Sequence, residues 1–149
     1  MIQNQYMDLA LREALKGQKN GEVPIGCIIL DENKNILSSA YNEVITNNDP
    51  TAHAQITAIR QACSYVNSSR LSNCSLYVTL EPCIMCASAI SRAKIRRLFY
   101  GADDKKYGSI NGHINFFQSN ICNHIPEIYD NINKNKCEEL INNFFKDKR

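Results

Sequence analysis

The chain has no tryptophan, only six glycines and four prolines, and no long uninterrupted apolar run. A membrane-spanning helix requires about 20 predominantly apolar residues in succession, so the sequence argues against an integral membrane protein. Residues 1–16 have the pattern of an amphipathic helix rather than that of a signal peptide. We therefore expect a soluble, cytoplasmic protein with no membrane partner.

A strong charge of either sign is also missing, because 17 Lys and Arg face 15 Asp and Glu, which leaves a formal net charge of +2. This balance is far from the strongly basic composition of many nucleic-acid-binding domains, so charge neither indicates nor excludes RNA binding. The 149 residues are 44% hydrophobic, which suffices for one core, and the chain has neither an internal repeat nor a linker. We expect residues 1–149 to form a single domain.

Hydrophobic periodicity predicts alternating helices and strands. Apolar residues three or four positions apart predict helices over residues 3–16, 49–65, 82–92 and 137–145. Apolar, β-branched runs predict strands over residues 23–30, 36–42, 75–80 and 95–100. Asp49-Pro50 is a plausible N-cap and first helical position, and Gly17–Gly21 is expected to end the first helix. The strand-helix-strand succession from residue 75 to residue 100 requires a parallel pair, so the fold class is α/β.

Seven cysteines are present, and an odd number without an export signal indicates thiols or metal ligands rather than a disulfide framework. Cys83 and Cys86 lie three residues apart behind Pro82, which marks a helix start, and His53 follows the other expected helix start. Thiolates and imidazole are ligands that Zn²⁺ prefers. Three protein ligands leave a fourth tetrahedral position for water, as in catalytic zinc sites; a fourth ligand such as Cys74 or His113 would indicate a closed structural site.

Each part of this pattern has a simpler explanation when taken alone. A C-x-x-C pair is also found in structural zinc half-sites, redox pairs and protein cores, and most histidines are not ligands. The combination of His53-Ala54-Gln55 with Pro82-Cys83-x-x-Cys86 is more specific, because it differs from the zinc-deaminase signature H-x-E…P-C-x-x-C at one position. The combined pattern therefore favours a zinc deaminase.

Several further segments resemble bacterial tRNA-specific adenosine deaminases, which are cytidine-deaminase-like zinc enzymes. The resemblance covers most of the chain and is carried by Glu22–Pro24, Asn42, Asp49–Ala54, Leu76–Cys83 and Met85–Ala87, with a weaker likeness after Gly108 that includes Phe144-Phe145 followed by Lys and Arg. It implies a three-layer α/β/α fold with a mixed five-stranded sheet, one Zn²⁺ per chain and a homodimer. It also implies hydrolytic deamination of adenosine to inosine at the wobble position of tRNA.

The resemblance also implies roles for individual residues. His53, Cys83 and Cys86 would bind the zinc ion, and Asn42 would hydrogen-bond the bound nucleoside. Asp104, Lys106 and Phe145 would contact the anticodon arm of the tRNA. The basic residues Lys146, Lys148 and Arg149 close the chain, and a further basic concentration spans Arg92, Lys94, Arg96, Arg97, Lys105 and Lys106.

Gln55 departs from the family, which has a glutamate there that moves a proton from the attacking water to the base and then to departing ammonia. Glutamine has nearly the same shape but cannot accept and release a proton, so we expect the chain to be nearly inactive. Three explanations compete: an engineered substitution, which the intact ligand set favours, a natural loss of activity, or a site that works without this carboxylate. The last would have to use Glu81 or Glu22, and a structural role fits Glu81 better.

Two other functions remain open. The same enzyme class could act on a free base or nucleoside such as guanine or cytosine. Alternatively, the chain could be a non-catalytic zinc and RNA binding module. The match around residues 49–55 and the Phe144-Phe145-basic ending favour the tRNA substrate over a free base, since a free-base enzyme would not need them.

Overall fold

The structure is a computed structural model and describes residues 2–147. Its helices are α1 (Ile2–Lys19), α2 (Ala54–Val66), α3 (Ile84–Arg92) and α4 (Lys134–Asp147), with a short 3-10 turn, η1, at Phe116–Gln118. Its strands are β1 (Gly26–Leu30), β2 (Ile36–Tyr41), β3 (Ser75–Leu80), β4 (Arg97–Ala102) and β5 (Glu127–Tyr129). None of the described helices is both long enough and apolar enough to cross a lipid bilayer.

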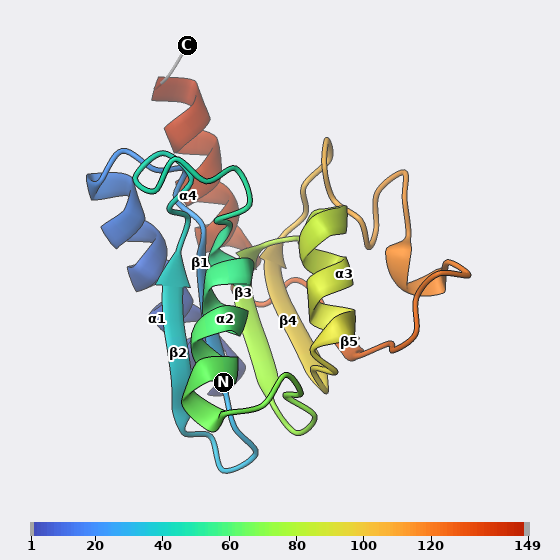
Figure 1. Ribbon diagram of the computed structural model, residues 1–149. Coiled ribbons are helices and arrows are strands. Elements are labelled where there is room, and N and C mark those ends of the chain that lie inside the picture. Colours follow the sequence, from blue (N-terminus) through green and yellow to red (C-terminus); the bar gives the residue numbers. More distant parts are fainter. Residues whose placement is uncertain (1, 148–149) are drawn as a thin grey trace.

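The five strands form one open, mixed sheet in the order β2-β1-β3-β4-β5 (Figure 1). β1 is antiparallel to both β2 and β3, whereas β3, β4 and β5 run parallel to one another. α3 connects the parallel strands β3 and β4, which confirms the predicted strand-helix-strand unit. The carboxyl ends of β3 and β4 therefore lie at the same end of the sheet.

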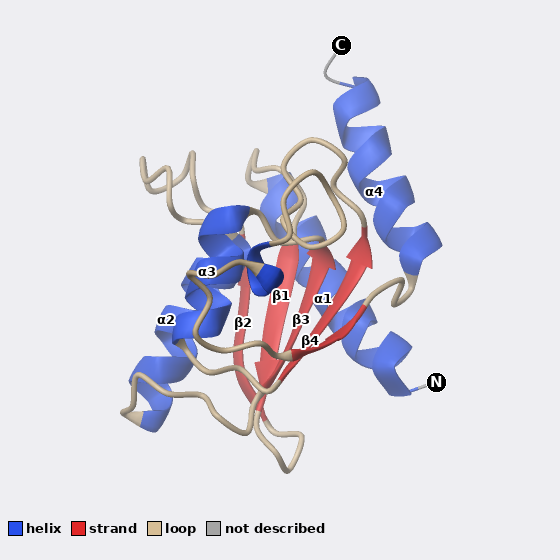
Figure 2. Ribbon diagram, turned by 90° about the vertical axis from the view of Figure 1, so that its right-hand side faces the viewer, coloured by secondary structure: helices blue, strands red, loops and turns tan. Residues whose placement is uncertain are grey.

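Helices cover both faces of the sheet, which confirms the expected three-layer α/β/α fold. α2 and α3 lie on one face and α1 and α4 on the other (Figure 2). The larger core joins the sheet to α2 and α3, where Ala54, Ala58 and Ala62 of α2 and Ala87 of α3 are fully buried. The smaller core joins the sheet to α1 and α4 through side chains such as Met7 and Cys137. Small side chains on α2 and α3 allow both helices to pack close to the sheet.

α1 crosses β1 at Gly26, where a side chain would have no room. A Cβ there would lie 1.8 Å from the carbonyl oxygen of Ala10 and 2.6 Å from the amide nitrogen of Ala14. We expect Gly26→Ala to lower the free energy of unfolding by about 3 kcal/mol or more, because the clash is with helix backbone that cannot rotate away. Urea unfolding would measure the loss, and Ser39→Ala on the exposed side of β2 should change it by less than about 0.5 kcal/mol. A Gly26→Ala protein as stable as the parent would contradict this packing.

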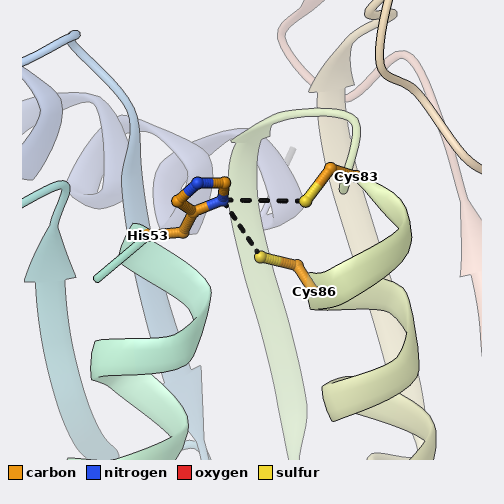
Figure 3. A group of neighbouring side chains, drawn as sticks. All are labelled: His53, Cys83 and Cys86. Atoms are coloured by element: carbon orange, nitrogen blue, oxygen red, sulfur yellow. Dashed lines mark hydrogen bonds between the residues drawn. The ribbon is translucent and has the colours of Figure 1, made fainter. Parts of the chain in front are cut away.

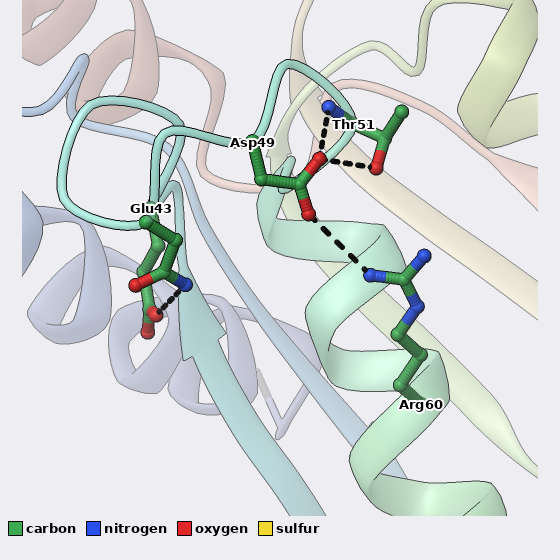
Figure 4. Close-up of polar contacts among 5 residues, drawn as sticks. Glu43, Asp49, Thr51 and Arg60 are labelled. Carbon is green, nitrogen blue, oxygen red and sulfur yellow. Dashed lines mark hydrogen bonds and ion pairs between the residues drawn. The ribbon is translucent and has the colours of Figure 1, made fainter.

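Several predicted boundaries were wrong. α2 begins at Ala54 and not at Asp49-Pro50. α1 runs three residues past the predicted range of 3–16 and ends at Lys19, inside the Gly17–Gly21 segment that was expected to end it. The Asp49 side chain does not cap a helix: its Oδ1 accepts hydrogen bonds from the Thr51 amide at 2.9 Å and the Thr51 hydroxyl at 2.7 Å (Figure 4). These hydrogen bonds form a local turn. The second carboxylate oxygen of Asp49, Oδ2, lies 3.8 Å from the guanidinium group of Arg60.

Candidate metal and substrate site

The N-termini of α2 and α3 bring three potential metal ligands together (Figure 3). His53 is the N-cap of α2 and Cys83 is the N-cap of α3, and both have extended backbone conformations. Cys86 follows in the first turn of α3 and is fully buried. Both thiols therefore lie at the helix start that Pro82 marks, with Cys83 directly before the first turn. Neither N-cap side chain forms a capping hydrogen bond, so both are available to a ligand.

The spacing of these side chains matches that of a zinc site. His53 Nδ1 lies 3.6 Å from Cys83 Sγ and 3.5 Å from Cys86 Sγ, and all three ligand atoms lie within 4.8 Å of one another. A tetrahedral zinc ion with ordinary Zn–N and Zn–S bonds separates such nitrogen and sulfur atoms by about 3.6 Å. In residues 2–147 this is the one such group of His, Cys, Asp or Glu, and it includes neither Cys74 nor His113.

The electrostatics of the three groups favour a thiolate beside the imidazole. A hydrogen bond with the Cys86 thiol is the main cause that lowers the pKa of Cys83 to about 4; burial opposes the shift and His53 adds to it. The bond with Cys83, together with burial, raises the pKa of Cys86. The bond with Cys83 also raises the pKa of His53, although burial opposes this. The donor set is thus one imidazole and two thiols, one of which ionises readily.

Gln55 is the second residue of α2 and is only 4% exposed. Its side-chain amide has no hydrogen-bond partner among the residues that the structure describes. Among these residues, every side-chain nitrogen or oxygen that solvent cannot reach has a partner, so the amide of Gln55 must remain partly accessible. The amide of Gln55 is therefore free to bond a bound molecule. It lies two residues from the candidate ligand His53.

Asn42, directly after β2, is fixed beside the start of α2. Its Oδ1 accepts a hydrogen bond of 2.8 Å from the amide of Ala54, the residue that follows His53. This bond satisfies a helix N-H group that His53 leaves free. Because Oδ1 is engaged, the side chain presents its Nδ2 as a donor, and no described residue accepts from it.

Glu22 does not act as a free carboxylate in the site. It is 1% exposed and accepts hydrogen bonds from the Thr46 amide and hydroxyl, both at 2.7 Å, and from the Ile45 amide at 3.2 Å. Burial alone would raise the pKa of Glu22, but the bonds from Thr46 and its neighbours outweigh burial and lower it. Glu22 thus holds the segment that leads from Asn42 to His53.

The stability that Glu22 provides should depend on pH. Because the folded state lowers its pKa, the contribution is complete above the unfolded value of about 4.5 and is lost as the pH falls through the folded value. We expect Glu22→Gln to cost about 1–3 kcal/mol at pH 7, and less below pH 4.5. Urea unfolding between pH 7 and pH 3 measures the difference, with Glu32→Gln in the exposed β1–β2 turn as control. A cost that stays constant with pH would contradict this role.

The proposed RNA-facing residues lie in two places. Asp104 follows β4, and its carboxylate accepts hydrogen bonds from the amides of Lys106 at 3.1 Å and Tyr107 at 3.0 Å. Lys106 is exposed, and its ammonium lies 5.2 Å from the Tyr107 ring centroid. Phe145 is 50% exposed near the end of α4. This helix extends past the end of the sheet at which β3 and β4 have their carboxyl ends (Figure 1). Lys148 and Arg149 lie outside the described residues.

The basic concentration predicted around β4 is not one surface. Arg96 and Arg97 lie at the amino end of β4 and each approaches Glu127 to 3.5 Å. Lys105 and Lys106 lie beyond its carboxyl end. The strand separates the two pairs, so only the second pair lies at the end that carries His53 and Cys83.

Comparisons with known proteins agree with this geometry. Residues 1–102 match the family model of the cytidine and deoxycytidylate deaminase zinc-binding region. The chain is 43% identical over 144 residues to a tRNA-specific adenosine deaminase of Agrobacterium fabrum, a match that covers 97% of this chain and 94% of that protein.

Two solved structures bear on the substrate. One comes from work on A-to-I editing by tRNA:A34 deaminases at the wobble position; its TM-score is 0.89 at 42% identity, and the match covers 91% of this chain and 98% of that one. The other is a guanine deaminase of Bacillus subtilis with a TM-score of 0.63 at 39% identity, for which the match covers 66% of this chain and 63% of that one. The likeness to the tRNA-acting protein extends over far more of both chains.

Proposed function

Because the chain belongs to the zinc-binding cytidine and deoxycytidylate deaminase family, and within it to the tRNA-specific adenosine deaminases, we propose that it binds the anticodon arm of tRNA at a site built to convert wobble adenosine to inosine. The main support is that His53, Cys83 and Cys86 lie together as potential zinc ligands. They do so in a chain that matches a tRNA-specific adenosine deaminase over nearly its whole length. The shorter match to guanine deaminase makes a free-base substrate the second candidate.

His53, Cys83 and Cys86 would hold one zinc ion per chain. Their spacing and donor types support this assignment, and three protein ligands leave one tetrahedral position open to solvent. When bound, zinc lowers the pKa of water so that the water can act as a nucleophile near neutral pH. Cys86 is fully buried in the first turn of α3, and His53 and Cys83 occupy the N-cap positions of α2 and α3, so all three ligands lie at helix starts that pack against the sheet.

Asn42 would orient the nucleoside. Its Oδ1 is occupied by the Ala54 amide, so the side chain can donate only through Nδ2, which fits an acceptor on the ribose or the base. Gln55 would hydrogen-bond the bound base through an amide that has no other partner. An amide cannot carry a proton to the ring nitrogen or to the leaving amine, so this chain would bind its substrate and convert it slowly.

The surroundings of the site would bind the rest of the RNA. Exposed Lys106 and Phe145 offer a cation and an aromatic face, and Asp104 shapes the loop that presents Lys106. Residues 1–149 would form one deaminase domain that acts in the cytoplasm, where tRNA is found. The exposed Ile84 and the small, half-buried Ser88 and Ala89 on α3 support a homodimer, because small side chains allow a second copy to approach.

Binding by the unaltered chain tests the proposal. We expect one zinc per chain by elemental analysis. We also expect an anticodon stem-loop with adenosine at the wobble position to bind at least about 10-fold more tightly than the same stem-loop with cytidine there, because discrimination by a base pocket is worth about 1–3 kcal/mol. Equal affinity for both stem-loops together with tight binding of free guanine would favour the free-base function. Affinities should be compared at one salt concentration.

A further inference from the structure

A buried carboxylate, Glu81, lies directly between β3 and the metal-binding segment. It is 3% exposed and forms no ion pair with a described lysine, arginine or histidine. A buried charge without a cation is costly unless its oxygens accept hydrogen bonds. Glu81 meets this requirement with three backbone amides from a single loop, as its Oε1 accepts from Asp104 at 3.0 Å and its Oε2 from Ile110 and Asn111 at 2.9 Å each.

The same loop is joined to the residues that follow Glu81. Gly108 forms an antiparallel bridge with Cys83, and the amide and hydroxyl of Ser109 donate to the Pro82 carbonyl at 3.1 and 2.8 Å. Gly108 packs so closely that a Cβ would lie 2.5 Å from both the Glu81 carboxylate and the Asp104 carbonyl. The loop and the Cys83 segment therefore form one tightly packed unit.

The outer part of this loop carries the residues proposed to face RNA. The side-chain carboxylate of Asp104 accepts hydrogen bonds from the backbone amides of Lys106 and Tyr107. The backbone amide of Asp104 itself donates a hydrogen bond to Glu81. Tyr107 is 63% exposed. Glu81 consequently bonds both ends of a loop whose middle points outward. Both of its oxygens accept hydrogen bonds from backbone amides of this loop, which supports a structural role for Glu81.

We propose that Glu81 is a positioning residue that holds the 104–111 loop in its RNA-binding shape and fixes it to the Cys83 segment, an inference that rests on the proposed function for its RNA partner. A neutral side chain of the same size cannot do this. Glutamine has one acceptor oxygen, so its NH₂ group must face either the Asp104 amide or the Ile110–Asn111 pair, donor against donor. One end of the loop would be released.

The test is Glu81→Gln. Hydrogen exchange should become at least 10-fold faster at the amides of Asp104, Ile110 or Asn111, while the amides of β3 and β4 keep their protection. Zinc content should stay at one per chain. Affinity for the anticodon stem-loop should fall about 10-fold. In the Gln55→Glu background, KM should rise about 10-fold with kcat changed less than 3-fold, a split that a general loss of folded protein would not produce.

Glu22→Gln is the matched control, because Glu22 is an equally buried glutamate that holds the other loop beside the site. It should leave exchange at Asp104, Ile110 and Asn111 unchanged. If Glu81→Gln does not fold, Gly108→Ala is the second variant, because its added methyl group would collide with the Glu81 carboxylate. It should accelerate hydrogen exchange at the same three amides. If either variant folds and its amides of Asp104, Ile110 and Asn111 exchange hydrogen as slowly as in the parent protein, the inference is wrong. Failure of the parent to bind RNA would instead refute the proposed function, and the exchange experiment would still decide the role of Glu81.

Discussion

Replacing Gln55 with glutamate should raise the rate of inosine formation in an anticodon stem-loop by about 10²–10⁴-fold, which is the range that one general acid-base group contributes. The rest of the site needs no repair, because the distances from His53 Nδ1 to both sulfurs already match those of a tetrahedral zinc centre. Gln55 is buried at the start of α2 with no competing hydrogen bond among the described residues, so a glutamate of the same length fits the same space. The substitution adds a group that can accept and release a proton.

The measurement is single-turnover conversion of a stem-loop with adenosine at the wobble position. Gln55→Asp is the matched control: it adds a carboxylate that is one methylene too short to occupy the same place, so it should recover much less activity. A Gln55→Glu protein that binds zinc and RNA but forms no inosine would refute the enzyme assignment and favour a non-catalytic binding module. Trace activity in the unaltered chain is compatible with the proposal, since the expected loss is finite.

Cys86→Ser in the Gln55→Glu background should reduce zinc to well below one per chain and lower inosine formation by more than about 10⁴-fold. Two ligands cannot hold the ion in a tetrahedral site, and water without zinc has a pKa near 15.7 rather than about 7. Cys63→Ala is the control, because Cys63 is a half-buried cysteine of α2 that lies outside the ligand group. It should keep its zinc and its activity, and equal zinc loss in both variants would remove Cys86 from the proposed ligand set.

Residue chemistry explains why the candidate ligands could be found from the sequence. Two cysteines three residues apart behind a proline, together with a distant His-x-Gln, form a rare combination that specifies the ligand types and, through Pro82, the helix start that carries the two cysteines. The order of the larger elements also followed from local patterns, because buried runs such as β3 and periodic segments such as α1 carry strong signals.

Long-range contacts explain what could not be found. The start of α2 was misplaced because its first amide is bonded by Asn42, 12 positions earlier in the chain, whereas Asp49 uses its carboxylate within its own turn. The predicted range of the first helix stopped before Gly17, yet α1 continues through this glycine, whose missing side chain makes room for Tyr41, since a Cβ would lie 2.9 Å from that ring. β5, with three residues, is too short to show a pattern and exists only through its pairing with β4. No local signal in the sequence marks any of these contacts.

The helices that carry His53, Cys83 and Cys86 are attached to the sheet by their own apolar side chains. Ala58 and Ala62 fasten α2, and Ala87 and Ile90 fasten α3, all fully buried away from the ligand atoms. The chain thus differs from a zinc finger, in which the metal supplies the folding energy. We therefore expect the protein to keep its fold when zinc is removed and to take up zinc again without unfolding, so that loss of the metal would cost it the bound ion rather than its structure.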